Sequence, residues 1–408
     1  MALNLIWSGF FIAAAGIGIY QSLLGNYDIW QKLTEALWVS ADMGVKTALG
    51  LTGVLCFWLG LLKVAEKSGL TAILAKLLRP WLRAVMPDLS PNSPAFGSIA
   101  LNMAANILGL DNAATPMGLR AMEQMQAENP HKDRASNPQV MFMVLNSSSL
   151  TLLPVTILMY RFQFGSANPA LVFIPILLAT LTSTLVGFLA TAIWQKINIF
   201  RPVVLAYIAG AVLTAGALGW WFAGLDDAGK ATLTAAASNA ILFGIALSFI
   251  VFGLIKKQNV YENFIEGAKD GFKTAVMIIP YLVAMLAAIG VFRAAGGIDA
   301  LCKIAAFIPE HLGFDAEFVK ALPAALMKPL SGSGARAMML DIFKTYGADS
   351  FAGFVASIVQ GSTETTFYVL AVYFGAVNLK KTGAALPLAL LADAAGITAA
   401  VGLAYAFY

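Results

Sequence analysis

The chain has 408 residues, of which 59% are hydrophobic and only 12% are charged. Soluble domains carry roughly 25% charged residues, so this composition, with a mean hydropathy of +0.77, excludes an ordinary soluble domain. The net charge of +4 is small, and in a membrane protein it reports loop orientation rather than affinity for nucleic acid. We therefore expect an all-α, multi-pass protein of the lipid bilayer and no nucleic-acid partner.

Elements of the same kind are predicted in the same order in each half of the chain. The order is a span, an amphipathic piece, a second span, a second amphipathic segment, an interrupted stretch, a broken span and a closing span. In the first half these elements occupy residues 3–24, 28–41, 43–63, 69–86, 92–122, 139–160 and 168–195. In the second half they occupy residues 231–255, 258–270, 272–293, 298–308, 316–340, 352–375 and 383–407. A further span, at 202–223, has no partner and lies between the halves.

Three short motifs of the first half return in the same order in the second half. They are GVKTA (44–48) and GFKTA (271–275), GLRAM (118–122) and GARAM (334–338), and NSSSLT (146–151) and QGSTET (360–365). An internal duplication in a membrane protein is typical of transporters. We expect a first repeat over residues 1–200, a linker helix over 201–226 and a second repeat over 227–408.

Equivalent connectors of the two repeats carry opposite charge. Segment 63–83 holds five basic residues against one acid, whereas its counterpart, 293–317, holds two basic residues against four acids. Because cytoplasmic loops are rich in Lys and Arg, the two repeats are predicted to be inverted relative to each other. We expect about nine full crossings plus two re-entrant hairpins, with the amino terminus cytoplasmic and the carboxyl terminus outside the bacterial inner membrane.

Polar residues interrupt four segments at membrane depth, at 102–116, 146–149, 328–334 and 360–366. Backbone broken by Gly and Pro survives there only when it is buried in protein or lines a water-filled cavity, and paired breaks in two halves indicate a transport site. Close packing of helices through Ser, Thr and Gly is the alternative interpretation. The residues predicted to bind a solute or ion are Asn106, Asp111, Asn112, Thr115, Asn146, Ser147, Ser148, Ser331, Ser333, Gln360, Ser362, Thr363 and Glu364.

Glu364 lies inside a predicted span, where a carboxylate costs about 2.5–3.5 kcal/mol to insert. Such a residue can take up a proton, bind a cation or pair with a basic group such as Lys328 or Arg336. A purely structural ion pair is the alternative. Asp393 and Asp111 are weaker candidates of the same kind. The equivalent arginines of the GLRAM and GARAM motifs, Arg120 and Arg336, either bind an anionic solute, or cap broken helix ends or anchor at the membrane interface.

The run at 111–122 resembles the signature of spore maturation protein A, and the runs at 329–338 and 360–368 resemble that of spore maturation protein B. The chain is thus similar to a fusion of these two proteins. Both belong to the nucleoside-recognition or Gate group, which is similar to part of the concentrative nucleoside transporters and to the membrane part of bacterial ferrous iron transporters. The resemblance implies a membrane core that translocates a solute, without naming the solute.

We therefore expect an alternating-access transporter for a small polar solute, such as a nucleoside, an amino acid or short peptide, or a carboxylate, coupled to Na⁺ or H⁺. The alternative is a non-transporting assembly factor or scaffold for the envelope or for spore maturation. We expect no enzyme activity, cofactor or metal centre, because Cys56 and Cys302 are isolated and His131 and His311 lack ligand-like neighbours. The oligomeric state stays open, and a homo-oligomer is one alternative.

Overall fold

The computed structural model describes residues 2–148, 150–224, 227–311, 313 and 315–408, and these residues form helices joined by short connections. An isolated bridge between Arg134 and Lys381 is the one extended pairing among them. The helices are α1 (Ala2–Leu23), α2 (Ile29–Lys67), α3 (Leu70–Val85), α4 (Ala95–Leu108), α5 (Asp111–Glu128), α6 (Asn137–Ser148), α7 (Val155–Gln163), η1 (Pro169–Val172), α8 (Phe173–Trp194), α9 (Pro202–Ala223), α10 (Asp227–Ile255), α11 (Val260–Ala294), α12 (Gly297–His311), η2 (Glu317–Ala321), α13 (Leu322–Met327), α14 (Gly332–Tyr346), α15 (Phe351–Ser362), α16 (Thr366–Ala376) and α17 (Ala385–Phe407).

Within the described residues, 6 helices are long and apolar enough to cross a membrane. Their spanning segments are Asn4–Leu23, Ile29–Lys67, Pro169–Trp194, Thr232–Ile255, Val260–Ala294 and Ala385–Phe407. Shorter apolar helices lie at Ala95–Leu108 and Pro202–Thr214. The protein is therefore a helical, multi-pass membrane protein, as its composition predicts.

The prediction of separate amphipathic pieces before the second span of each half is wrong. Residues 28–41 and 43–63 belong to one continuous helix, α2, and residues 258–270 and 272–293 belong to α11. The sequence between the expected pieces contains no proline, and a single glycine at each junction, Gly44 or Gly271, is tolerated within a helix. The change from polar to apolar residues thus marks the membrane boundary and not the end of a helix.

Helices α2 and α11 pack against each other along their length and run antiparallel. Near one end of the contact Gly44 lies against the backbone of Val283, and further along Gly271 lies against Cys56. A Cβ atom on Gly271 would lie 2.6 Å from the Cα of Cys56. The two backbones approach this closely because one residue of each contact, Gly44 or Gly271, is a glycine and has no side chain.

The closing helices α8 and α17 form a second antiparallel pair. Gly187 lies against Ala392, and Gly396 lies against Ser183, so the contact moves down one helix as it moves up the other. The hydroxyl of Ser183 donates to the carbonyl of Ala392 at 2.8 Å. Both pairs join helices that occupy equivalent positions in the two halves.

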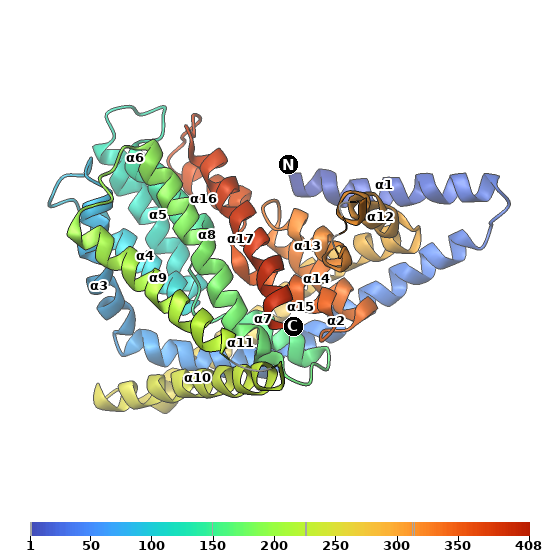
Figure 1. Cartoon of the computed structure of the whole chain (residues 1–408), viewed down its shortest axis with the longest axis horizontal. Helices are drawn as coiled ribbons and strands as arrows, with labels where there is room; N and C mark the ends of the chain where they lie inside the picture. Colours follow the sequence, from blue (N-terminus) through green and yellow to red (C-terminus); the bar gives the residue numbers. More distant parts are fainter. Residues whose placement is uncertain (1, 149, 225–226, 312, 314) are drawn as a thin grey trace.

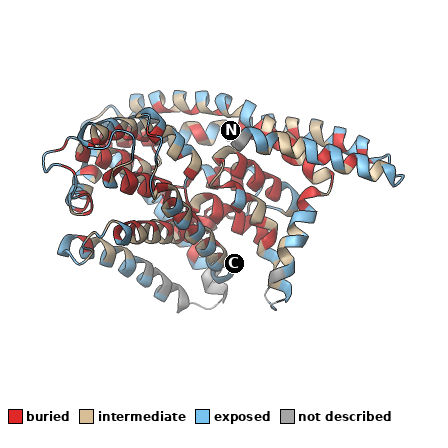
Figure 2. Cartoon of the chain, turned by 90° about the horizontal axis from the view of Figure 1, so that it is seen from above, coloured by how far each residue is buried: buried red, intermediate tan, exposed pale blue. Residues whose placement is uncertain are grey.

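Helix α1 and the first part of α2 extend to one side as an arm, and α2 continues beneath the body to α3, which lies with α4, α5 and α9 at the opposite side (Figure 1). Buried residues concentrate in the body between these extremes, and the arm is largely exposed (Figure 2). In the body, helices of one half contact helices of the other: α5 packs on α16, and α15 packs on both α7 and α8. This interleaving brings the interrupted segments together.

Candidate functional site

The first interruption of each half lies between two short helices. In the first half α4 ends at Leu108, and Gly109 turns the chain with a φ of +73°, which is a conformation that favours glycine. In the second half α13 ends at Met327, and Ser331 caps α14 by accepting a hydrogen bond from the N–H of Gly334 at 3.0 Å. At both breaks the backbone leaves the regular helix, and local hydrogen bonds such as Leu110 N–H to Ala105 and Ser331 N–H to Met327 close the turn.

The second interruption of each half lies within the predicted broken span. Helix α6 ends at Ser148 and α7 begins at Val155, and α15 ends at Ser362 and α16 begins at Thr366. Backbone hydrogen bonds join these segments. The N–H of Glu364 donates to the carbonyl of Ser147 across the halves at 2.7 Å.

Each second break is also bonded to the first break of its own half. The N–H of Leu152 donates to the carbonyl of Ile107 at 2.9 Å, and the N–H of Phe367 donates to the carbonyl of Pro329 at 3.0 Å. The same contact therefore occurs at corresponding places in the two halves. Together with the bond between Glu364 and Ser147, it brings all four interruptions into one region.

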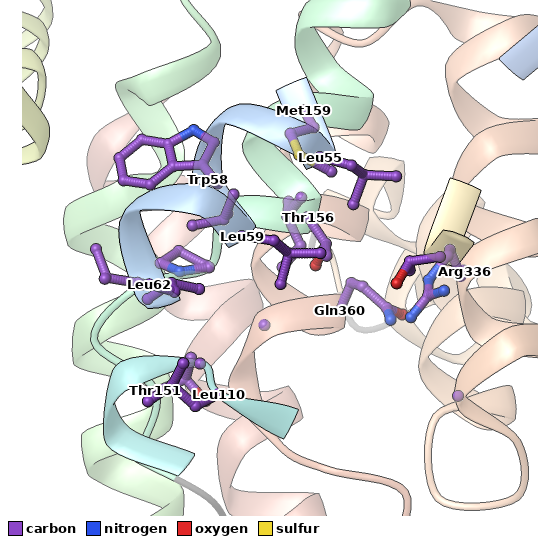
Figure 3. Close-up of a pocket in the computed structure, with 18 of the residues that line it drawn as sticks. Leu55, Trp58, Leu59, Leu62, Leu110, Thr151, Thr156, Met159, Arg336 and Gln360 are labelled. Carbon is purple, nitrogen blue, oxygen red and sulfur yellow. The ribbon is translucent and has the colours of Figure 1, made fainter. Parts of the chain in front are cut away.

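A cavity of about 300 Å³ lies at this meeting point and is lined by both halves. Apolar side chains of α2, among them Leu55, Trp58 and Leu62, form one wall (Figure 3). Arg336 and Gln360 lie next to each other at the other end of the view. The polar and charged residues of the lining are Lys63, Glu66, Thr151, Thr156, Asp270, Thr274, Lys328, Arg336, Gln360, Thr363 and Glu364. Such a mixture of apolar walls and few polar groups is typical of small-molecule sites.

Two opposite charges of the lining form no ion pair with any residue that the structure describes. Arg336 lies over the ring of Tyr160, with its guanidinium carbon 5.9 Å from the ring centroid. Glu364 is exposed, and its side chain faces the cavity, while its N–H is bonded to Ser147. One cationic and one anionic group are thus available to a solute.

The cavity reaches a cluster of charges near the end of α2. There Lys63 pairs with Glu66 at 3.1 Å and with Glu266 of α11 at 3.5 Å, and Lys67 pairs with Glu266 at 3.8 Å. Lys63 and Glu66 line the cavity, as does Asp270 of α11. This side of the cavity is therefore polar and partly open to solvent.

The structure places part of the predicted site at the cavity. Gln360, Thr363 and Glu364 line it, whereas Ser331 and Ser333 flank the lining residue Gly332 and are not in the lining themselves; their hydroxyls lie 3.3 Å apart. The other described members of the predicted site, Asn106, Thr115, Asn146, Ser147, Ser148 and Ser362, do not line it. The side chains of Asp111 and Asn112 lie outside the part of the structure that is described.

Several predicted residues bond to other groups of the protein instead. Asn106 donates to the side-chain oxygen of Asn146 at 2.9 Å, and Asn102, which lies in the same interrupted segment but was not predicted as a site residue, donates to the hydroxyl of Tyr373 on α16 at 3.1 Å. The hydroxyls of Ser148 and Ser362 lie near the carbonyls of Leu145 and Val359 in their own helices. The Ser147 hydroxyl bonds to that of Thr366. These contacts connect the broken helices of both halves behind the cavity.

The sequence did not single out the cavity residues that α2 and α11 supply, such as Trp58, Lys63, Glu66 and Asp270. These residues belong to long, regular helices, and nothing in their local pattern distinguishes the face toward the cavity. Their position follows from the antiparallel contact between α2 and α11, which no single segment encodes.

Ion pairs join the two halves on opposite sides of the cavity region. Arg161, at the end of α7, is completely buried and pairs with Asp349 at 2.7 Å. Lys381, which follows α16, pairs with Asp133 at 2.8 Å, and both partners are exposed. Asp349 and Asp133 lie in corresponding connectors, just before α15 and α6, and each pairs with a cation that follows the broken span of the other half.

These features define a class of protein: a helical, multi-pass membrane protein whose broken helices meet at a cavity. Residues 48–163 match the Gate family, described as "Nucleoside recognition". The chain is 48% identical over 157 residues to spore maturation protein B of Bacillus subtilis strain 168, covering 38% of this chain and 86% of that protein. It is 38% identical over 180 residues to spore maturation protein A of the same strain, covering 44% of this chain and 89% of that protein.

The chain belongs to the family of spore maturation proteins A and B. Matches to both proteins within one chain are consistent with a fusion of the two, as the motifs around 111–122 and 329–338 predict. No solved structure matches this chain.

Proposed function

We propose that the protein is a membrane transporter for a small polar solute and works by alternating access between two inverted halves. The observation that carries this proposal is the cavity of about 300 Å³ at the meeting point of the four broken segments, which both halves line. Interrupted helices at corresponding places in two repeats are a recurring form of transport site. The unwound backbone is tolerated at membrane depth because it faces a polar cavity.

The antiparallel pairing of equivalent helices supports inverted repeats. Helices α2 and α11 hold equivalent positions in the two halves and run in opposite directions, and so do α8 and α17. Repeats of parallel orientation would place equivalent helices in the same direction. We propose a first repeat over residues 1–200, a linker helix over 201–226 and a second repeat over 227–408, with about nine crossings in all.

Contacts between the halves are compatible with this topology. With the amino terminus in the cytoplasm, the inverted arrangement puts Lys381 and Asp133 on the cytoplasmic side and Arg161 and Asp349 on the outer side. Each observed ion pair then joins two residues of the same side. With parallel repeats the partners of each pair would lie across the membrane from each other. The basic segment 63–83 faces the cytoplasm in this topology, as the positive-inside rule requires.

The charges of the cavity favour a solute that carries both an anionic and a cationic group. Arg336 offers two parallel N–H groups to a carboxylate, and Glu364 is suited to accept from an ammonium group. A neutral nucleoside would leave both charges without a partner. Within the range of small polar solutes we therefore favour an amino acid or a short peptide, with the apolar wall of α2 in contact with its side chain.

Uptake into proteoliposomes tests the proposal. Purified protein is reconstituted and offered radiolabelled amino acids, dipeptides, nucleosides and small carboxylates, after a thermal-shift screen has selected those that raise the melting temperature. Glu364→Gln and Arg336→Gln are each expected to weaken solute affinity about 10- to 100-fold, since a hydrogen bond to a charged group contributes about 1.5–3 kcal/mol. Lys46→Gln, at an exposed site on α2 whose partner, Asp42, does not line the cavity, is the matched control and is expected to leave uptake unchanged.

The second candidate function is a non-transporting assembly factor or scaffold. Its support is that the two relatives carry names that refer to spore maturation and not to transport. Under this alternative, no solute in the panel raises the melting temperature or enters the vesicles. Glu364→Gln would then complement a deletion strain as well as the wild-type gene.

A further inference from the structure

Asp393 is the only charged residue of α17, and it is buried, with 1% of its surface exposed. It lies on the closing helix of the second half, behind the cavity wall and not in the lining. A carboxylate inside a membrane-spanning helix is costly and usually has a functional partner. Because Asp393 is not part of the cavity lining, binding of a solute in the cavity does not explain why this carboxylate is present.

Hydroxyl groups surround one side of this carboxylate. Thr366, at the first turn of α16, donates from its hydroxyl to Oδ2 of Asp393 at 2.7 Å. The hydroxyl of Ser147, from the end of α6, bonds to the Thr366 hydroxyl in turn. Because Thr366 donates to the carboxylate, Ser147 is the donor in that second bond. Two broken helices, one from each half, are thus linked to Asp393.

The other side of the carboxylate holds an oxygen and a neighbouring hydroxyl, neither of which forms a well-aligned hydrogen bond with any described residue. Oδ1 of Asp393 is buried and has no hydrogen-bond partner among the described residues, and the same holds for the hydroxyl oxygen of Thr363. Thr363 lies beside Asp393 and is almost fully buried, since only 3% of its surface is exposed. Buried polar atoms without partners are rare and call for an explanation. Two adjacent oxygens of this kind are an arrangement that a small cation would satisfy.

The surrounding helices pack closely at this point, so only a small ion fits beside the carboxylate. Gly396, one turn beyond Asp393, has no side chain, and a Cβ there would lie 2.8 Å from the Thr363 methyl group and 3.2 Å from the carbonyl of Ser362. Among described residues the charged groups close enough to interact with Asp393 are Lys328 and Glu364, both from the second half. Helices α6, α8 and α16 face it with hydroxyls and glycine instead.

We propose that Asp393, Thr363 and Thr366 form a binding site for a small monovalent cation, either Na⁺ or a proton. Oxygen atoms of a carboxylate and of hydroxyls suit a hard cation such as Na⁺, and the same oxygens accept a hydrogen bond from a protonated Asp393. In both cases the cation neutralises the buried carboxylate and satisfies the acceptors around Oδ1.

The site is placed to couple this cation to the solute, an inference that rests on the proposed transport function. Thr363 lines the cavity on one side and lies beside Asp393 on the other. Lys328 lines the cavity and interacts with Asp393 as well. Neutralising Asp393 therefore strengthens the positive potential that a solute anion meets at Lys328. Glu364, which is exposed to the cavity, is assigned to the solute and not to the cation.

Thermal unfolding of the purified full chain in nanodiscs tests cation binding without a solute. Melting temperatures are compared in NaCl and KCl of equal ionic strength and across a pH series, for the wild type, Asp393→Asn, Thr363→Val and Glu364→Gln. For a Na⁺ site, saturating Na⁺ raises the wild-type melting temperature by about 3 °C or more relative to K⁺. For a proton site the two salts give the same result, and the melting temperature of the wild type rises relative to Asp393→Asn as the pH falls.

Both responses are expected to disappear in Asp393→Asn, which keeps the shape and the bond from Thr366. They persist in Glu364→Gln. Thr363→Val is expected to lower the apparent affinity for Na⁺ about tenfold, or to shift the pH response, and it keeps Asp393 in place if Asp393→Asn fails to fold. The inference is overturned if the wild type responds to neither ion, or if the Asp393 and Thr363 variants respond as the wild type does. Because these measurements involve no transport, a failure of uptake in vesicles would leave their outcome unaffected.

Discussion

Arg161 shows how a single side chain can hold the two halves together. Its guanidinium is fully buried and donates to the carbonyl of Ala348 at 2.6 Å, to the hydroxyl of Ser357 at 3.1 Å and to the carboxylate of Asp349 at 2.7 Å. Ala348 and Asp349 lie just before α15 and Ser357 lies within it, all in the other half. A planar guanidinium suits this task because its N–H groups point in fixed directions.

Arg161→Met is expected to destabilise the protein by about 1–3 kcal/mol, because it leaves the carbonyl of Ala348 without its donor, whereas Asp349 is partly exposed and keeps its bonds from Ser166 and Ala167. Thermal unfolding of the purified protein measures this. Asp133→Asn removes one partner of the exposed pair in the corresponding connector and is the matched control. It should leave the melting temperature unchanged, as is usual for exposed ion pairs. Equal effects of the two substitutions would contradict this account.

Only part of the candidate site could be predicted residue by residue. Thr363 and Glu364 stand out in the sequence because polar groups in an apolar span need a partner, and both lie at the cavity. Asn106 and Asn146 stand out for the same reason, but they bond each other. Local sequence shows that a polar group needs a partner, and only the packing of helices decides whether that partner is a solute or another side chain.

At the scale of elements, the antiparallel contact of α2 with α11 depends on glycine. Gly271 faces the backbone of Cys56, whereas Gly53, on α2, has no atom within 4 Å of a Cβ built on it. The two glycines thus have the same helical conformation and opposite surroundings. Replacing each glycine by alanine therefore distinguishes the effect of helix propensity on stability from the effect of packing between helices.

Gly271→Ala is expected to destabilise the protein by about 1–3 kcal/mol, because the added methyl group overpacks a contact between two backbones. Gly53→Ala is expected to be neutral or to stabilise by about 0.5–1 kcal/mol, since alanine favours a helix where space is open. Melting temperatures of the two variants in the same detergent measure the difference. A loss of stability in Gly53→Ala as large as that in Gly271→Ala would show that the contact is not responsible.

The positions of the helix breaks could be predicted from sequence, whereas the lengths of the long helices could not. Glycine, proline and polar residues end α4, α6, α13 and α15 near the expected places. No such signal marks the boundary where α2 and α11 leave the apolar region, so the helices continue. Hydropathy indicates whether a residue lies in lipid or in water, whereas the end of a helix is indicated only by helix-terminating residues such as glycine and proline.

At the scale of the whole molecule, the inverted topology predicts where equivalent connectors lie. In a variant without native cysteines, Lys67→Cys and Asp299→Cys place one thiol at the end of α2 and one in α12, at side chains that are 45% and 59% exposed. A membrane-impermeant thiol reagent added to intact cells is expected to label Asp299→Cys. It should label Lys67→Cys only after the membrane is permeabilised. Labelling of both from the same side would exclude inversion.

The contacts that cross between the halves have a consequence for how such proteins assemble. Three contacts join residues before 200 to residues after 227: the glycine contact of α2 with α11, the ion pair of Arg161 with Asp349 and the ion pair of Lys381 with Asp133. None of them requires a covalent link between the two parts. Genes encoding residues 1–200 and 201–408 separately, expressed together, should therefore yield two polypeptides that co-purify as a stable heterodimer, whereas either polypeptide expressed alone should be degraded. By the same reasoning, relatives that exist as separate A and B chains should depend on each other as subunits.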